Sequence, residues 1–378
     1  MVLKAMDSDW ENLPKDLLDL IFERLELQSD YLAFSVVCKS WNSVAKNNCS
    51  QAGPMLLISS DKKDTWKLYD VTNDKVLDLR LRLSNKRFSG SSKGWLVVVE
   101  ENYAVTLMNP FSRVKGCKEK ENSIISLPPL MHPDQSFKDL NHCLCKATIS
   151  TYPILNADSC IVTVIYGDHD HFAFIRLGQD TNWTYIDDRG LQFPLVEEVV
   201  HIGDKVYAVN QRGRLLSFDI TSESEIKCKN FSEEVKNSLR MSSKTYLLNS
   251  NEKGLLIVKR HANWEGNVLD GKAVTYKFEI FELNFDKHEW IEKETLDDAA
   301  LFLGNNSSVF VVASKFPGCQ PNCIYFNSDW HPANWGPEDF GVYNIKTQSI
   351  SKPYTTTAMA LLGRTTRPAM WVVPTSRQ

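Results

Sequence analysis

Apolar residues in the first 50 positions recur at the period of an α-helix. Between residues 13 and 25, leucine, isoleucine and phenylalanine return every three or four positions, which places them on one face. Pro14 suits the first turn of this helix, where its missing N–H group costs nothing. Ser29 can cap a second helix, and the apolar pattern around Trp41 continues into a third. The Gly-Pro pair at 53–54 ends the helical region, so we expect three short helices.

The pattern changes after residue 54, where short apolar runs alternate with Gly, Asn, Asp and Ser. Such an alternation is typical of β-strands joined by turns. One short polar segment, 232–239, is the only helix that the pattern predicts in this part of the chain. The expected strands are 55–58, 66–71, 95–99, 161–166, 172–177, 206–209, 215–218, 255–258, 276–283, 309–312 and 324–326.

One unit recurs weakly along the strand-rich region: an apolar strand that ends in Asp or Asn, followed by turn residues and another strand. Its six instances are centred on Asp70, Asn109, Asp180, Asp219, Asn284 and Asn344. The mean interval of about 55 residues is near the longer blade periods of β-propellers. We therefore predict an all-β propeller, most simply with six blades; two β-sandwiches with coincidental turn chemistry are the alternative. Because a closed ring must hide its first and last edges, we expect 55–58 to pair with 370–373.

Charge and composition narrow the classes of function. The chain has 378 residues, with 43 Lys and Arg against 47 Asp and Glu, a formal net charge of −4. Such a surface has no general attraction for nucleic acid, and no apolar run approaches the roughly 18 residues of a transmembrane helix. The N-terminus shows no secretory h-region, and nine cysteines, an odd number, favour reduced thiols over a disulfide framework. We therefore expect a cytoplasmic or nuclear protein with no nucleic-acid or membrane partner.

Residues 10–50 carry a specific combination of motifs. A Leu-Pro pair opens the segment, and a Val-Cys-x-x-Trp ending follows about 23 residues later. With these motifs the segment resembles the F-box, a small domain of three helices. The matching residues are Leu13, Pro14, Leu17, Leu18, Ile21, Leu25, Leu32, Phe34, Val37, Cys38, Ser40, Trp41 and Val44.

The remainder of the chain resembles a large plant family, the KIB-type F-box proteins with a C-terminal kelch-like propeller of formerly unknown function. The matching stretches are Asn109-Pro110-Phe111, 203–209, 302–305, 323–326 and the ending with Arg367-Pro368, Trp371 and Pro374. A charged insert at 115–122 and the lack of Gly-Gly pairs depart from true kelch repeats. The resemblance divides the chain into an F-box domain, 1–50, and a kelch-like β-propeller that recognises a substrate, 51–378.

This resemblance implies a non-catalytic adaptor in an SCF-type ubiquitin ligase. An F-box docks on a Skp-family adaptor protein, which links it to cullin and RING subunits, and the propeller presents a target protein for ubiquitination and degradation. Such a chain needs no cofactor and no catalytic residues. Two alternatives stay open, a propeller-based enzyme or small-molecule binder and an F-box protein that acts outside the ligase.

The residues themselves support an interface on the helical segment. A segment of about 40 residues is too small to stabilise itself readily, and it has more apolar residues than its own core needs. The alternative is that these residues pack against the propeller. We expect adaptor binding by Leu13, Pro14, Leu17, Leu18, Ile21, Leu25, Leu32, Phe34, Val37, Cys38 and Trp41.

Other clusters of reactive side chains have simpler explanations. The Gly-Asp-His-Asp-His run at 167–171 lies between two apolar strands, so it fits a hairpin turn better than a metal site. The cysteine pairs at 143 and 145 and at 319 and 323 lack zinc-ribbon spacing, and we expect small buried thiols. The sequence contains no G-x-S-x-G, P-loop or dinucleotide-binding motif.

One loop stands apart as a candidate for binding the substrate. Residues 329–337 hold two tryptophans and two prolines next to a glycine, which excludes a central strand. Tryptophan is enriched at binding hot spots, although such a loop can also fold its rings back onto a blade. We expect Trp330, His331 and Trp335 to contact the substrate, with Trp264 as a weaker candidate.

Overall fold

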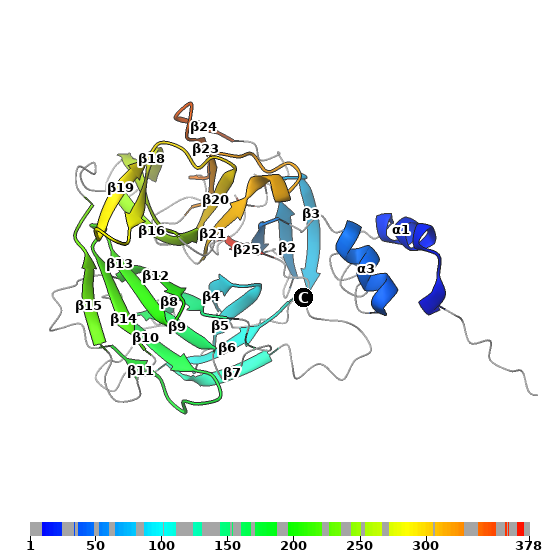
Figure 1. Ribbon diagram of the computed structural model, residues 1–378, viewed down its shortest axis with the longest axis horizontal. Coiled ribbons are helices and arrows are strands. Elements are labelled where there is room, and N and C mark those ends of the chain that lie inside the picture. The colour runs from blue at the N-terminus through cyan, green and yellow to red at the C-terminus, as the bar shows by residue number, and fades with distance from the viewer. Residues whose placement is uncertain are drawn as a thin grey trace, which may run out of the picture.

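The structure is a computed structural model, and it has two parts, a pair of helices at one side and a ring of β-sheets (Figure 1). It describes residues 10–24, 34, 37–48, 53–59, 65–80, 87–100, 102–110, 124–130, 144–151, 153, 160–167, 171–186, 196–220, 227–235, 243–250, 254–266, 272–304, 307–328, 339–352, 360, 362 and 369–373. Among these residues, no helix is long and apolar enough to cross a membrane.

The helical part begins with a short 3-10 turn, η1 (Trp10–Asn12), followed by α1 (Lys15–Glu23) and α3 (Lys39–Asn48). Pro14 is the N-cap of α1, one position before the first turn in which it was predicted, and its carbonyl oxygen accepts the N–H groups of Leu17 and Leu18. Of the second predicted helix, Ser29 lies outside the described residues. A small core of six buried side chains holds the part together: Leu18, Phe22, Phe34, Trp41, Val44 and Ala45.

The strands form six sheets, which are the six blades of a propeller. From the centre outward, blade 1 holds β25 (Met370–Val372), β1 (Met55–Ser59), β2 (Thr65–Asp70) and β3 (Lys75–Arg80), and blade 2 holds β4 (Arg87–Ser92), β5 (Trp95–Val99), β6 (Ala104–Met108) and β7 (Ile124–Pro129). Blade 3 holds β8 (Leu144–Ile149), β9 (Ile161–Tyr166), β10 (His171–Arg176) and β11 (Thr184–Tyr185), and blade 4 holds β12 (Val196–Ile202), β13 (Lys205–Asn210), β14 (Leu215–Asp219) and β15 (Lys227–Ser232). Blade 5 holds β16 (Ser243–Ser250), β17 (Gly254–Glu265), β18 (Lys272–Asn284) and β19 (Glu289–Lys293).

Blade 6 departs from the regular order. It has five strands, in the order β21 (Ser307–Val312), β20 (Ala299–Gly304), β22 (Cys323–Phe326), β23 (Gly341–Asn344) and β24 (Ser349–Ser351). Strand β20 forms a hairpin with β21 toward the centre, a 3-10 turn, η3 (Ala313–Lys315), follows, and β22 then lies parallel to β20.

The first strand of each sheet contacts the first strands of its two neighbours, which closes the ring. The predicted closure is confirmed, because β25 pairs antiparallel with β1 and brings Val372 opposite Met55. The buried apolar side chains form six further clusters, one between each pair of neighbouring blades. The helix predicted at 232–239 is wrong over its described part, since Ser232 ends β15 and residues 233–235 are not helical.

The recurring Asp or Asn has a structural role in the hairpin that leads to the outermost strand of a blade. Oδ1 of Asp70 accepts the N–H group of Asn73 three positions later, and Oδ1 of Asn284 and of Asn344 accepts the equivalent N–H group in blades 5 and 6. These side chains replace backbone partners and fix a four-residue turn. In each of the three turns the last residue has a positive φ: Asp74, His288 and Gln348. The six predicted units therefore correspond to one per blade.

Candidate interaction surfaces

The helical part exposes more large apolar side chains than its size explains. Trp10 is 55% exposed, Leu17 47%, Leu20 49% and Val37 48%. Leu17 and Leu20 lie three positions apart on α1 and therefore share one face of the helix. Exposed apolar surface of this kind is a candidate for contact with another protein.

Nine of the eleven residues predicted to bind an adaptor lie within the described residues, and they divide into three groups by burial. Leu18, Phe34 and Trp41 fill the core of the helical part, and the Phe34 and Trp41 rings lie 4.5 Å apart between centroids. These three side chains support the surface rather than form it. The partly buried residues are Leu13, Ile21 and Cys38, the exposed ones are Pro14, Leu17 and Val37, and Leu25 and Leu32 lie outside the described residues.

Two surface residues escaped the sequence-based prediction, Trp10 and Leu20. The Trp41 indole N–H donates to the carbonyl oxygen of Trp10 at 2.8 Å. This bond connects the 3-10 turn that carries Trp10 to α3. Leu20 follows the same helical period as its neighbours, so its exposure is a result of packing and not of a separate motif.

The residues predicted to bind the substrate come from two segments, the aromatic loop at 329–337 and the strand that carries Trp264. Trp330, His331 and Trp335 lie outside the described residues. Trp264 lies on β17, where it pairs with Ala273 of β18. These are the two longest strands among the described residues of the propeller, and together they form an extended hairpin on blade 5.

A buried arginine connects the bases of these two segments. Arg260 on β17 is 0% exposed, and its guanidinium donates to the carboxylate of Asp339 at 2.8 Å and to the carbonyl oxygen of Asn327 at 2.9 Å. It also donates to the Thr275 hydroxyl at 2.7 Å, and the Thr275 N–H donates to Asp339 at 3.0 Å. Asn327 and Asp339 flank the aromatic loop, and Thr275 lies at the base of the hairpin that carries Trp264. The two predicted substrate-binding segments therefore start from one place, between blades 5 and 6.

The centre of the ring holds a second buried ion pair. Lys146 on β8 contacts Glu198 on β12, and the Ser308 hydroxyl of β21 donates to the same carboxylate at 3.0 Å. Burial raises the pKa of Glu198, and the nearby Lys146 ammonium opposes that rise. This pair joins the innermost strands of blades 3, 4 and 6, so it stabilises the ring rather than a reactive site.

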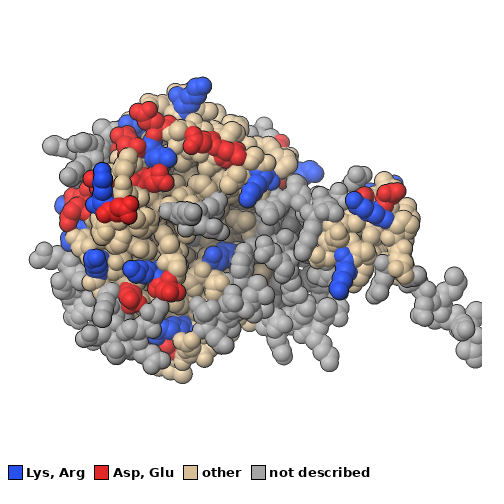
Figure 2. Space-filling model, in the orientation of Figure 1, with Lys and Arg blue, Asp and Glu red and all other residues tan. Residues whose placement is uncertain are grey.

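The surface charges are mixed. On the face shown in Figure 2, acidic and basic side chains alternate, with acidic ones most frequent at the upper left, where Figure 1 places β18 and β19. No group of three or more His, Cys, Asp or Glu side chains within the described part of the chain could hold a metal ion. The thiols of Cys38, Cys160, Cys228, Cys319 and Cys323 are free.

Comparison with known proteins agrees with both parts of the fold. Residues 10–51 match the F-box domain. A helical F-box joined to a six-bladed ring defines an F-box protein with a β-propeller.

The propeller has a family of its own. Residues 68–344 match the KIB1-4 beta-propeller, and the chain belongs to this family. It is 24% identical to the F-box protein SKIP23 of Arabidopsis thaliana, over 90% of each chain. It is 26% identical to the putative F-box protein At3g25750 of the same plant, over 85% of this chain and 88% of the relative.

Proposed function

We propose that this protein is the substrate-recognition subunit of an SCF-type E3 ubiquitin ligase. The F-box would bind a Skp-family adaptor, and through it cullin and RING subunits, while the propeller holds the target protein. The observation that carries this proposal is the set of exposed apolar side chains on the F-box, Trp10, Leu17, Leu20 and Val37. The protein would act in the cytoplasm or the nucleus.

The division of labour follows from the architecture. In this proposal the chain performs no chemistry, because ubiquitin transfer belongs to the other subunits. Its contribution is positional, since binding two proteins at once turns their encounter into an intramolecular event. A ring closed by its own terminal strand is a suitable support, because projecting loops on a rigid scaffold carry recognition.

We further propose that the target is bound beside blades 5 and 6, with Trp330, His331, Trp335 and Trp264 in contact. The hydrogen bonds that join Arg260 to Asn327, Thr275 and Asp339, here called the Arg260 clamp, support this choice. They anchor both segments that carry the predicted residues. The test is to replace Trp330 and Trp335 together with Ala and to measure target capture and adaptor capture in parallel. Lost target capture with intact adaptor binding and an unchanged melting temperature supports the site, whereas early melting means that the rings are core residues.

The adaptor interface has a direct test. Replacing Leu13 and Pro14 together with Ala should weaken capture of a Skp-type adaptor, because large apolar side chains contribute about 1.5–3 kcal/mol each when buried. Cullin should co-purify with the unchanged protein and be lost with this variant. Undiminished capture at equal expression contradicts the adaptor role, and capture of the adaptor without cullin indicates an F-box protein that acts outside the ligase.

A further inference from the structure

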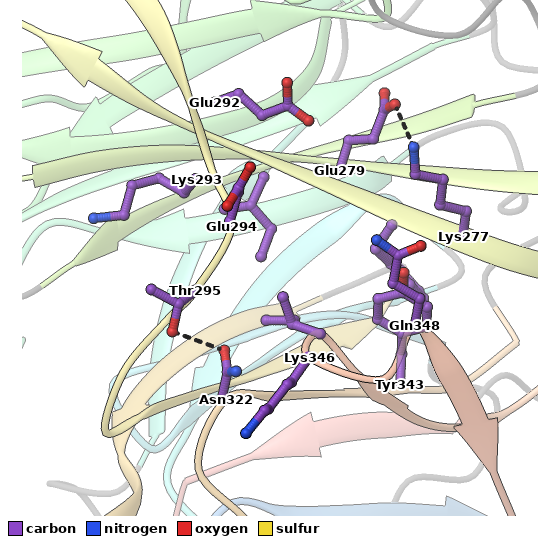
Figure 3. A pocket seen from close by; sticks show the side chains of 13 residues that line it. Lys277, Glu279, Glu292, Lys293, Glu294, Thr295, Asn322, Tyr343, Lys346 and Gln348 are labelled. Atoms are coloured by element: carbon purple, nitrogen blue, oxygen red, sulfur yellow. Dashed lines mark hydrogen bonds and ion pairs between the residues drawn. The ribbon is translucent and has the colours of Figure 1, made fainter.

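A groove of about 540 Å³ lies between the outer strands of blades 5 and 6 (Figure 3). It exists because β19 is short: the last pair between β18 and β19 is Ile280 with Lys293, and the earlier part of β18 has no outer neighbour among the described strands. Phe278, Ile280 and Tyr343 provide apolar lining. The groove is therefore an opening at the rim of the ring, next to the position where the Arg260 clamp holds Asp339.

Most charges of the groove neutralise one another. Lys277 forms an ion pair with Glu279 at 3.1 Å, and Glu279 also bonds to the buried His261 at 3.0 Å. Lys293 forms an ion pair with Glu282 at 3.0 Å. The charges of these side chains are already paired, so they contribute little to the binding of a charged ligand.

Three charged side chains in the lining remain available. Glu292, Glu294 and Lys346 form no ion pair with any residue that the structure describes. Glu292 lies on β19, and Glu294 follows at the bend directly after Lys293, the last residue of that strand. Figure 3 shows them on one side of the groove, with Lys346 and Gln348 on the other. One wall therefore accepts hydrogen bonds and carries negative charge, while the opposite wall donates them.

This arrangement suits a peptide better than a metal ion or a small anion. A guanidinium or ammonium group would bind the two carboxylates, and guanidinium does so with paired hydrogen bonds. Lys346 and Gln348 would donate to the carbonyl oxygens of the same segment. No metal-binding group occurs in the described part of the chain.

We propose that this groove binds an extended segment of the recruited protein through one arginine or lysine side chain, held by Glu292 and Glu294. The inference rests on the proposed function, because it names the chemistry by which the propeller reads its target. The groove would add a second contact to the one proposed above for Trp330 and Trp335.

The probe is a set of fluorescein-labelled heptapeptides, Ser-Val-Thr-X-Val-Thr-Ser with blocked ends, in which X is Arg, Lys, Gln or Glu. Their binding to the full chain in complex with the Skp-type adaptor is followed by fluorescence polarisation. We expect the Arg and Lys peptides to bind at least about tenfold more tightly than the Gln peptide, with less preference at high salt. Replacing both carboxylates, Glu292→Gln with Glu294→Gln, should remove the preference. Replacing them with Lys should reverse it in favour of the Glu peptide.

Glu289→Gln is the matched control, because Glu289 is exposed on the same strand, is 3.8 Å from Lys287 and does not line the groove. It should leave the preference unchanged. Equal binding of the Arg and Gln peptides overturns the inference, as does the absence of saturation at about 1 mM for every peptide. An equal loss of binding in the control also overturns it. Adaptor capture is measured in the same preparations, so its failure contradicts the proposed function, whereas failure of the peptide preference alone contradicts only the groove.

Discussion

The F-box and the propeller bury their apolar residues in opposite ways. The ring buries its apolar residues within the chain. Each blade packs on two neighbours, and β25 pairs with the last free edge, that of β1. The F-box has one small core and leaves four large apolar side chains exposed within its described residues. The propeller thus closes on itself, whereas the F-box leaves apolar surface for the adaptor that we propose.

Removing the closing strand, β25, should have the largest effect on the propeller and should spare the F-box. Deleting residues 368–378 removes β25, including Trp371, whose ring is fully buried and donates to the carbonyl oxygen of Leu303 at 2.9 Å. Loss of a buried tryptophan side chain alone costs about 3–5 kcal/mol. We expect the melting temperature of the whole ring to fall in calorimetry, while adaptor capture by the F-box persists. Deleting only 374–378 is the control, and a truncated ring that melts as the control does contradicts closure by β25.

The buried ion pair at the centre gives the next effect. Lys146→Met leaves the Glu198 carboxylate buried without its partner, which costs about 3–5 kcal/mol of folding free energy, so urea unfolding should begin earlier. The double variant Lys146→Met with Glu198→Leu should recover most of this loss, because both charges are then removed. If the double variant is no more stable than the single one, the pair is not the source of the effect.

Two adjacent leucines of α1 allow the surface and the core of the F-box to be tested separately. Leu17 is exposed and Leu18 is buried in the F-box core. Leu17→Ala should weaken adaptor binding by about 1.5–3 kcal/mol, measured by calorimetric titration, and leave the F-box helicity unchanged. Leu18→Ala should instead reduce the helicity of residues 10–48 by leaving a cavity. Identical behaviour of the two variants would show that exposure does not separate interface from core here.

A histidine of the ring has no effect above pH 6.5, and its effect grows only as the pH falls. Burial, aided by the Lys93 charge, lowers the pKa of His201 to about 3. The folded protein therefore keeps His201 neutral where the unfolded chain, with a pKa near 6.5, binds a proton. Its contribution is fully present above pH 6.5 and declines as the pH falls toward 3, by at most about 1.4 kcal/mol per pH unit.

His201→Gln should flatten this part of the stability profile between pH 6.5 and 4 in urea titrations. His288→Asn, on an exposed turn of blade 5, serves as control and should keep the wild-type slope, because His201 is intact. An unchanged slope in His201→Gln means that other groups cause the acid sensitivity.

Much of the fold could be predicted because its signals are local. The Asp and Asn residues that end strands form side-chain bonds within their own turns, so each unit marks one hairpin. The reversed β20–β21 hairpin of blade 6 was not predicted, because both strands are apolar and a one-dimensional pattern carries no information on pairing order. The expected strand 255–258 was also too short. β17 continues through Lys259, Arg260 and His261, whose burial depends on partners far away in the sequence.

The candidate sites were predictable only in part, for the same reason. Apolar periodicity places Leu17 and Leu18 on one helix, but it cannot say which one packs on Phe34 and Trp41. Glu292 and Glu294 gave no signal, since charged residues at the end of a strand usually face solvent. Their availability follows from ion pairs that occupy the other charges of the groove.

Closure by β25 also orders events during synthesis. The ribosome makes β25 after every other strand of the ring, so blade 1 lacks its innermost strand until the remainder of the propeller has emerged. The F-box, made first, has no such dependence. A newly made chain can therefore meet its adaptor through the F-box while the ring is still open, and chaperones would find their main target in the unclosed edge between blades 1 and 6.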